Sequence, residues 1–181
     1  LGDVYKRQNL YMASEKFNSY KKKKCKSDEI NEFYYHDAVI DSVEVNGSNM
    51  IWKTSGVCIK TSNSQNNETY DTIADNLEMR FINFQIIDII KCGYEQYDNN
   101  NILIASYANK KLEGNEFYLV VDSMFDSKSY LRLYGGDYEA NNYCFDIEIN
   151  NELYGIILNY DMFIAEWNYT CLLYTSDAAD D

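Results

Sequence analysis

The only histidine of the chain, His36, stands directly before Asp37, where the first strong strand pattern begins. Enzymes use an imidazole beside a carboxylate for acid–base chemistry. Neighbouring side chains on a strand point to opposite faces, so we expect the His36 and Asp37 side chains not to pair directly. A single histidine excludes a metal centre built from several histidines, and it leaves one candidate for a histidine-dependent catalytic triad.

Asp146 and Glu148 are the second pair of side chains that could do chemistry. They alternate with apolar residues in a segment with strand periodicity, which places both carboxylates on one face, about 7 Å apart. Such a spacing is compatible with a hydrolase that uses two carboxylates. Any solvated strand face shows the same pattern, so His36, Asp37, Asp146 and Glu148 are candidates and none is assigned a catalytic role.

The remaining motifs predict no cofactor and no metal. Gly135-Gly136-Asp137 has too few glycines for a phosphate-binding loop, and we interpret it as a turn that ends a strand over 129–134. Before residue 171 the chain has four cysteines, with no C-x-x-C pair: Cys25, Cys58, Cys92 and Cys144. We expect them to be free, buried thiols, which favours a reducing compartment and a cytoplasmic location.

The balance of charges limits the classes of partner. The 181 residues include 16 Lys and Arg against 29 Asp and Glu, which gives a formal net charge of −13. That charge argues against nucleic acid and against anionic membranes as main partners, and it permits a basic protein partner. No run of residues approaches the roughly 18 apolar residues that a membrane span needs.

Both ends of the sequence resemble translated sequencing adaptors. Residues 1–8 contain VYKRQ, which can be encoded by GTG TAT AAG AGA CAG, and residues 171–181 begin with CLLYT, which can be encoded by TGT CTC TTA TAC ACA. The reverse complement of the first stretch contains the start of the second. We therefore leave both ends out of the fold prediction. Abundant Asn, Tyr, Lys and Ile, with no Pro, further indicate a metagenomic read from an AT-rich bacterium.

Hairpin patterns dominate the body of the chain. Residues 42–53 alternate in polarity around Asn46-Gly47, which is the strongest short signal for a two-residue turn. Residues 86–107 predict a second hairpin with its turn at 97–101, and residues 145–160 predict a third around Asn150-Asn151. We expect about seven strands in a mainly β, antiparallel sandwich or strongly curved sheet, with one or two short helices.

Two segments break the strand pattern. Residues 115–126 carry apolar side chains at helical spacing, which predicts a helix with Asn115 as its cap. Residues 9–30 are polar and include the basic block Lys21–Lys24, so we expect a helical or disordered arm. The domain prediction is therefore a polar arm over 9–30 and a single β-rich domain over 31–170.

A resemblance to known proteins adds one functional expectation. The segments His36–Trp52 and Tyr143–Trp167, the second containing Ala165-Glu166-Trp167, resemble a group of small acidic, β-rich bacterial proteins. Some members are candidate immunity proteins for secreted toxins. The resemblance implies a non-enzymatic protein that binds another protein, and it carries over no catalytic residue.

Two other functions stay open at this point. The chain could be a binder of a small ligand or carbohydrate, or a hydrolase that uses Asp146 and Glu148. It could also be a structural accessory protein. The acidic charge and the weak set of catalytic candidates lead us to expect a non-enzymatic binder of a basic partner.

Overall fold

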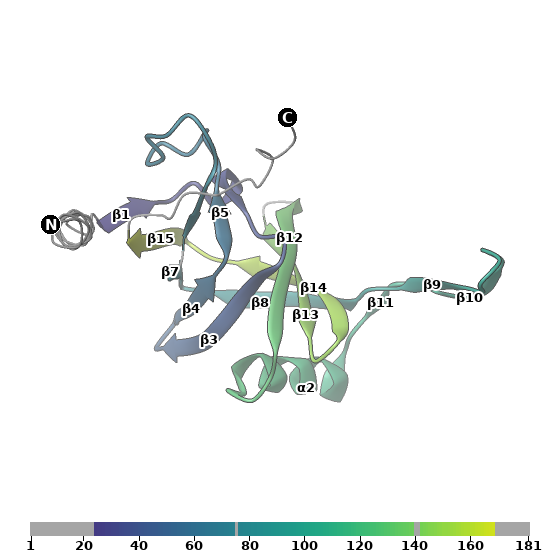
Figure 1. Cartoon of the computed structure of the whole chain (residues 1–181). Helices are drawn as coiled ribbons and strands as arrows, with labels where there is room; N and C mark the ends of the chain where they lie inside the picture. The colour runs from purple at the N-terminus through teal and green to yellow at the C-terminus, as the bar shows by residue number, and fades with distance from the viewer. Residues whose placement is uncertain (1–23, 75, 140–141, 169–181) are drawn as a thin grey trace, which may run out of the picture.

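The computed structural model describes residues 24–74, 76–139 and 142–168 (Figure 1). The described part contains many short strands, one α-helix and one 3-10 turn. In chain order these are β1 Lys24–Ser27, η1 Ile30–Glu32, β2 Phe33–Tyr34, β3 Ala38–Asn46, β4 Asn49–Ser55, β5 Val57–Ile59, β6 Thr72–Ala74, β7 Leu77–Ile82, β8 Gln85–Lys91, β9 Tyr94–Tyr97, β10 Leu103–Tyr107, β11 Lys110–Lys111, α2 Gly114–Phe125, β12 Leu131–Glu139, β13 Asn142–Ile149, β14 Glu152–Asn159 and β15 Met162–Asn168.

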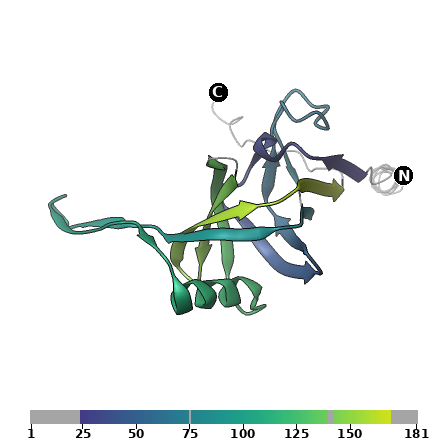
Figure 2. The same ribbon diagram turned by 180° about the vertical axis from the view of Figure 1, so that it is seen from behind.

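One strongly curved antiparallel sheet forms the body, as the hairpin patterns predict. Its ten strands follow the order β1-β15-β7-β4-β3-β12-β13-β14-β8-β11. Strands β7 and β8 follow each other in the chain but lie in opposite halves of this order, and so do β14 and β15. The connections between them cross from one half of the sheet to the other. The two halves thus face each other around a common core (Figures 1 and 2). A three-stranded sheet β2-β5-β6 and the separate hairpin β9–β10 complete the described strands.

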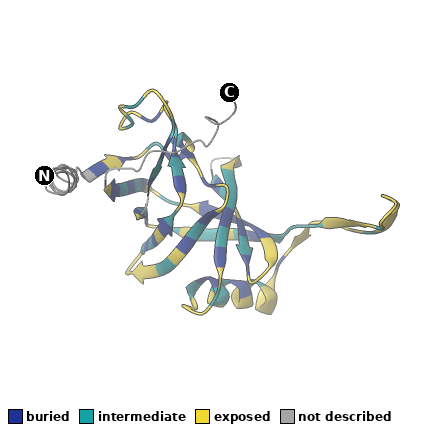
Figure 3. Cartoon of the chain, viewed as in Figure 1, coloured by how far each residue is buried: buried dark blue, intermediate teal, exposed yellow. Residues whose placement is uncertain are grey.

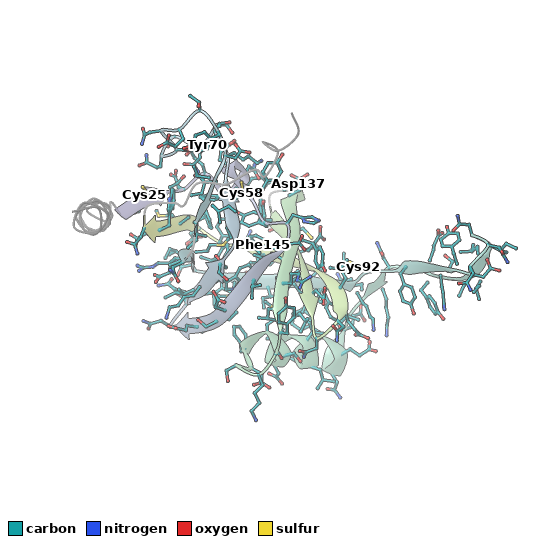
Figure 4. All side chains as sticks on the ribbon, in the orientation of Figure 1. Cys25, Cys58, Tyr70, Cys92, Asp137 and Phe145 are labelled. Atoms are coloured by element: carbon teal, nitrogen blue, oxygen red, sulfur yellow. The ribbon has the colours of Figure 1, made fainter. Side chains whose placement is uncertain are left out.

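Aromatic side chains fill the space between the two halves of the sheet. The ring centroids of Trp52 and Phe145 lie 4.9 Å apart, and Phe81 lies 5.0 Å from Trp52. All three side chains are fully buried. On β13, buried residues alternate with exposed or half-buried ones, so Phe145 faces this core while its neighbours face outward (Figure 4). Edge-to-face contacts of this kind add to the stabilisation from apolar burial.

Helix α2 confirms the helical pattern predicted for residues 115–126. Val120 and Met124 are buried against the sheet, and the helix lies below β12, β13 and β14 in Figure 1. Its N-cap is Glu113 rather than the predicted Asn115, and Gly114 has φ +55°. No helix among the described residues is long and apolar enough to cross a membrane.

The predicted hairpins are present, with small shifts at their turns. Asn46 pairs with Asn49, so the two turn residues are Gly47 and Ser48, one position later than predicted. Asn150 and Asn151 have φ +51° and +70°, as a tight turn with two left-handed residues requires.

Some predicted elements are wrong within the described residues. Gly135-Gly136 does not end a strand, because β12 continues through both glycines to Glu139. Lys24–Ser27, at the end of the predicted helical or disordered arm over 9–30, forms strand β1 against β15. Residues 9–23 and the adaptor-like ends over 1–8 and 171–181 lie outside the described residues.

The structure also has more strands than the seven expected, partly because the short strands β1, β6 and β11 form in segments where no strand is predicted. The four described cysteines are less deeply buried than predicted. Only Cys25 is fully buried, whereas Cys58, Cys92 and Cys144 are half-buried.

Candidate functional site

A groove of about 450 Å³ lies between β2 and the second half of β12. One wall consists of Asn31 and the segment Phe33–His36, with Lys60 beside it. The opposite wall is the β12 segment Tyr134–Asp137, and Tyr143 of β13 lies at its base. Asp137 stands at the upper end of β12 (Figure 4). The volume is within the usual range for ligand pockets.

A β-bulge in β12 shapes this wall. The register of β12 with β13 shifts between Leu133 and Gly135, so that Tyr134 and Gly135 together oppose Asp146. Gly136 follows, and a Cβ atom there would lie 2.4 Å from the Tyr143 ring. Only glycine fits at this position without displacing Tyr143 from the core.

His36 and Asp37 pair directly, contrary to the prediction. Their Nδ1 and Oδ2 atoms lie 2.9 Å apart, with both side chains largely exposed. The two residues do not belong to a strand: they occupy a turn in which the Ala38 N–H donates to the Tyr35 carbonyl, and Asp37 has φ +64°. The left-handed backbone of Asp37 removes the strand alternation on which the prediction relied.

A polar network connects this pair to Glu148. Arg132 Nη1 lies 3.8 Å from Asp37 Oδ1, and the Arg132 guanidinium donates to the Tyr130 hydroxyl at 2.7 Å. Arg132 also hydrogen-bonds to Tyr134, and the Tyr134 hydroxyl donates to Glu148 Oε2 at 2.6 Å, which raises the pKa of Tyr134. The structure therefore brings together three of the four predicted candidates through arginine and tyrosine side chains.

Asp146 is the fourth candidate, and it lies one step along the same outer face of β13 as Glu148. Its cross-strand neighbours are Gly135 on β12 and Gly155 on β14. Partial burial raises the pKa of the Asp146 carboxyl. Neither Asp146 nor Glu148 lines the groove, so the groove and the carboxylate pair are separate features.

The described residues contain no cluster of three or more His, Cys, Asp or Glu side chains that could hold a metal ion. The acidic loop Asp98–Asn101 binds its own backbone instead. The Asp98 carboxylate accepts hydrogen bonds from the N–H groups of Asn100 and Ile102, both at 2.8 Å.

The hairpin β9–β10 is the feature that the sequence prediction located but did not recognise as a surface. We call it the arm and define it as residues 94–107. The arm projects away from the body in Figures 1 and 2, and nearly all of it is exposed in Figure 3. Ile102 is 62% exposed, Leu103 49% and Ile104 61%. Three consecutive apolar residues in solvent are uncommon unless they serve a function.

Further exposed aromatic residues lie at the base of the same hairpin. Tyr94 and Tyr107 stack across the two strands with ring centroids 4.5 Å apart, and both are exposed. Gly93 directly precedes the arm and follows Cys92 (Figure 4), and a Cβ at Gly93 would lie 2.1 Å from the Tyr107 carbonyl oxygen. The arm is thus anchored by a close backbone contact at its base and by the Asp98 turn at its tip.

Comparisons of the chain with family models, with curated proteins and with solved structures found no match.

Proposed function

We propose that this chain is a non-enzymatic protein, of the immunity type, that binds a basic protein partner through its arm. The exposed Ile102-Leu103-Ile104 run is the observation that carries the proposal. Contiguous exposed apolar surface on a soluble protein marks an interaction site far more often than scattered apolar residues do. An isolated two-stranded hairpin is also only marginally stable in water, so a partner that covers it would stabilise it.

The charges around the arm favour a basic partner. The arm carries Glu95 and Asp98 and no Lys, Arg or His. The exposed face of the neighbouring helix α2 adds Glu116 and Asp122, although Glu116 is paired with Lys110 at 2.7 Å. A net charge of −13 would draw a basic protein toward this surface and accelerate association.

Two internal contacts bias the arm toward the hairpin that a partner would meet. The Asp98 carboxylate stabilises its turn and the Tyr94–Tyr107 stack joins its two strands, although the hairpin still opens readily without a partner. A preformed element loses less conformational entropy when it binds than a flexible loop does. Exposed Tyr and Ile side chains at the tip would supply the central contacts of such an interface.

The test begins with a long sequencing read across the native locus, which supplies the neighbouring genes. Each basic protein encoded by a neighbouring gene is purified. Its binding to the chain and to the double variant I102S/I104S is then measured by calorimetric titration. We expect one product to bind and the double variant to lose affinity by about a hundredfold, since two exposed anchors of an interface are removed. The variant V45S, at an exposed site on the β3–β4 hairpin, serves as the control and should bind normally.

Two outcomes would overturn the proposal. If no protein encoded by a neighbouring gene binds, the hypothesis that the chain is a structural accessory protein is the better one. If a product binds equally well to I102S/I104S, the arm is not the contact surface. An affinity that does not fall with added salt would remove the electrostatic part of the proposal.

A second candidate function is a hydrolase that uses Asp146 and Glu148. One observation favours it: the two carboxylates share a face but differ in surroundings, because Asp146 is partly desolvated and Glu148 accepts a hydrogen bond from Tyr134. Enzymes with two carboxylates separate their acid and base roles in this way. If the chain hydrolyses members of a glycoside panel, and the variants D146A and E148A both keep that activity, the two carboxylates are not its source.

A further inference from the structure

Strand β12 extends beyond its neighbour β3 and leaves an open position in the sheet. Among the described residues, β12 pairs on this side only through Arg132 with Val39 and Leu133 with Ala38. Within the described part of the chain, Tyr134 is the bulge residue and Gly135–Glu139 pairs only with β13. Alternate backbone N–H and C=O groups of a strand point to either side, so part of this segment presents unpaired groups toward the groove.

The turn at His36-Asp37 creates this open position. Coming from the N-terminal side, the chain runs along β2, reverses at Asp37 and only then joins the sheet as β3. Strand β2 pairs with β5 and is the end strand of its own three-stranded sheet. The groove of about 450 Å³ therefore lies between two strand edges, β12 and β2.

We propose that this groove binds an extended, basic segment of another protein, which adds to β12 as an extra strand. This surface is separate from the arm, so the inference goes beyond the proposed function. Strand addition to a free sheet edge takes its affinity from main-chain hydrogen bonds and its selectivity from alternate side chains. Hereafter we call the open position the β12 lane, defined by Tyr134–Glu139 and Phe33–Tyr34.

The surroundings of the β12 lane specify which side chains fit. The rings of Tyr35 and Tyr143 form its buried floor, which suits an apolar side chain of the incoming strand. Asp137 is exposed at its rim, where its carboxylate accepts the Tyr138 N–H at 2.7 Å and forms no ion pair with a described residue, so it suits a lysine or arginine of that strand. Lys60, on the β2 side of the groove, already donates to the Asn31 carbonyl at 2.6 Å. The overall charge of −13 disfavours an acidic segment.

The probe for a test is a synthetic hexapeptide that alternates lysine and valine. Titration into the isotope-labelled full chain is followed by amide chemical shifts and amide hydrogen exchange. We expect saturable changes in Tyr134–Glu139 and Phe33–Tyr34. Two versions of the peptide, each N-methylated at one set of alternate residues, distinguish main-chain pairing from charge attraction. At least one should bind about tenfold more weakly, because it cannot donate to the edge of β12.

A matched pair of variants tests the side-chain part of the inference. D137K should weaken binding of the lysine–valine peptide about fivefold, as expected for reversal of one exposed charge. D122K makes the same charge change on helix α2 and should bind like the parent chain. The arm variant I102S/I104S should also be unaffected, which separates this inference from the proposed function.

Three results would overturn the inference. Shift changes confined to residues outside the β12 lane would show that the peptide binds elsewhere. Binding of both N-methylated peptides as tight as that of the unmodified peptide, or no binding of any of the three, would exclude strand addition. Slow amide exchange throughout Tyr134–Glu139 in the chain without peptide would show that the lane is already occupied.

Discussion

The ring of Tyr143 occupies the space that a side chain on Gly136 would need, with a Cβ there only 2.4 Å from Cε1 of the ring. The glycine therefore allows a large aromatic residue to pack flat against β12. Tyr143 in turn contacts Phe145 at a centroid distance of 4.6 Å and forms the floor of the groove with Tyr35. One glycine thus links the packing of the core to the shape of the candidate site.

This relationship predicts that replacing each of two adjacent glycines with alanine changes the free energy of unfolding by a different amount. Gly136→Ala should lower the free energy of unfolding by about 1–3 kcal/mol, because it overpacks the core beside Tyr143. Gly135→Ala places its Cβ 3.4 Å from the end of the Asp146 side chain, so we expect a change within about 0.5 kcal/mol. Urea unfolding of both variants measures the difference. Similar values for the two would contradict the packing argument.

The turn at Asp37 gives a second prediction, in the comparison of D37A, D37G and D37N. All three remove the carboxylate that pairs with His36 and lies 3.8 Å from Arg132. Because Asp37 has φ +64°, D37A should be less stable than D37G by about 1 kcal/mol, and D37N should lie near D37G. Thermal and urea unfolding report this order. Equal stability of D37A and D37G would show that the left-handed turn does not persist in solution.

Buried tyrosines predict a loss of stability at alkaline pH. Burial raises the pKa of Tyr35 and Tyr143 well above their ordinary value of about 10. Their contribution to stability is therefore complete below about pH 10 and is lost as the pH rises toward the folded-state values. The free energy of unfolding should fall above pH 10, less steeply in Tyr143→Phe. Full titration of every tyrosine near pH 10 in the folded chain, seen by phenolate absorbance, would contradict this.

The tip of the arm should respond to acid. Hydrogen bonds from the N–H groups of Ile102 and Asn100 hold the pKa of Asp98 below its ordinary value of 3.8. A lowered folded-state pKa means that the turn is stabilised above the ordinary value and weakens as the pH falls through the lowered one. Amide exchange at Asn100 and Ile102 should accelerate in that range. In D98N the acid response should disappear, since an amide oxygen accepts the same bonds without titrating.

The regular parts of the fold could be predicted from the sequence because they follow local rules. Asn-Gly and Asn-Asn dipeptides indicate the two turns, and the apolar spacing around Val120 and Met124 indicates α2. By contrast, Gly135-Gly136 has the composition of a turn and yet lies inside β12. The reason is that Tyr143, on the next strand, packs over Gly136, and no local pattern reveals such a cross-strand contact.

The candidate site was harder to predict than the regular parts of the fold, because it too depends on contacts between distant parts of the chain. The pairing of His36 with Asp37 depends on one left-handed residue, and their connection to Glu148 depends on Arg132 and Tyr134, which come from a distant strand. The arm shows a different limit of prediction from the sequence. The apolar run over 86–90 and the Asn-rich turn at 97–101 predict a hairpin correctly, but a local pattern cannot show whether a body exists for the apolar side chains to pack against.

Protection of the arm against hydrogen exchange tests the central claim most directly. The amides of residues 94–107 are compared in the free chain and in the presence of the basic neighbouring product identified from the native locus. The account predicts rapid exchange through most of the arm in the free chain, because an isolated hairpin opens readily, and strong protection in the complex. An arm that gains no protection while the two proteins are bound would contradict the claim that the arm is the contact surface.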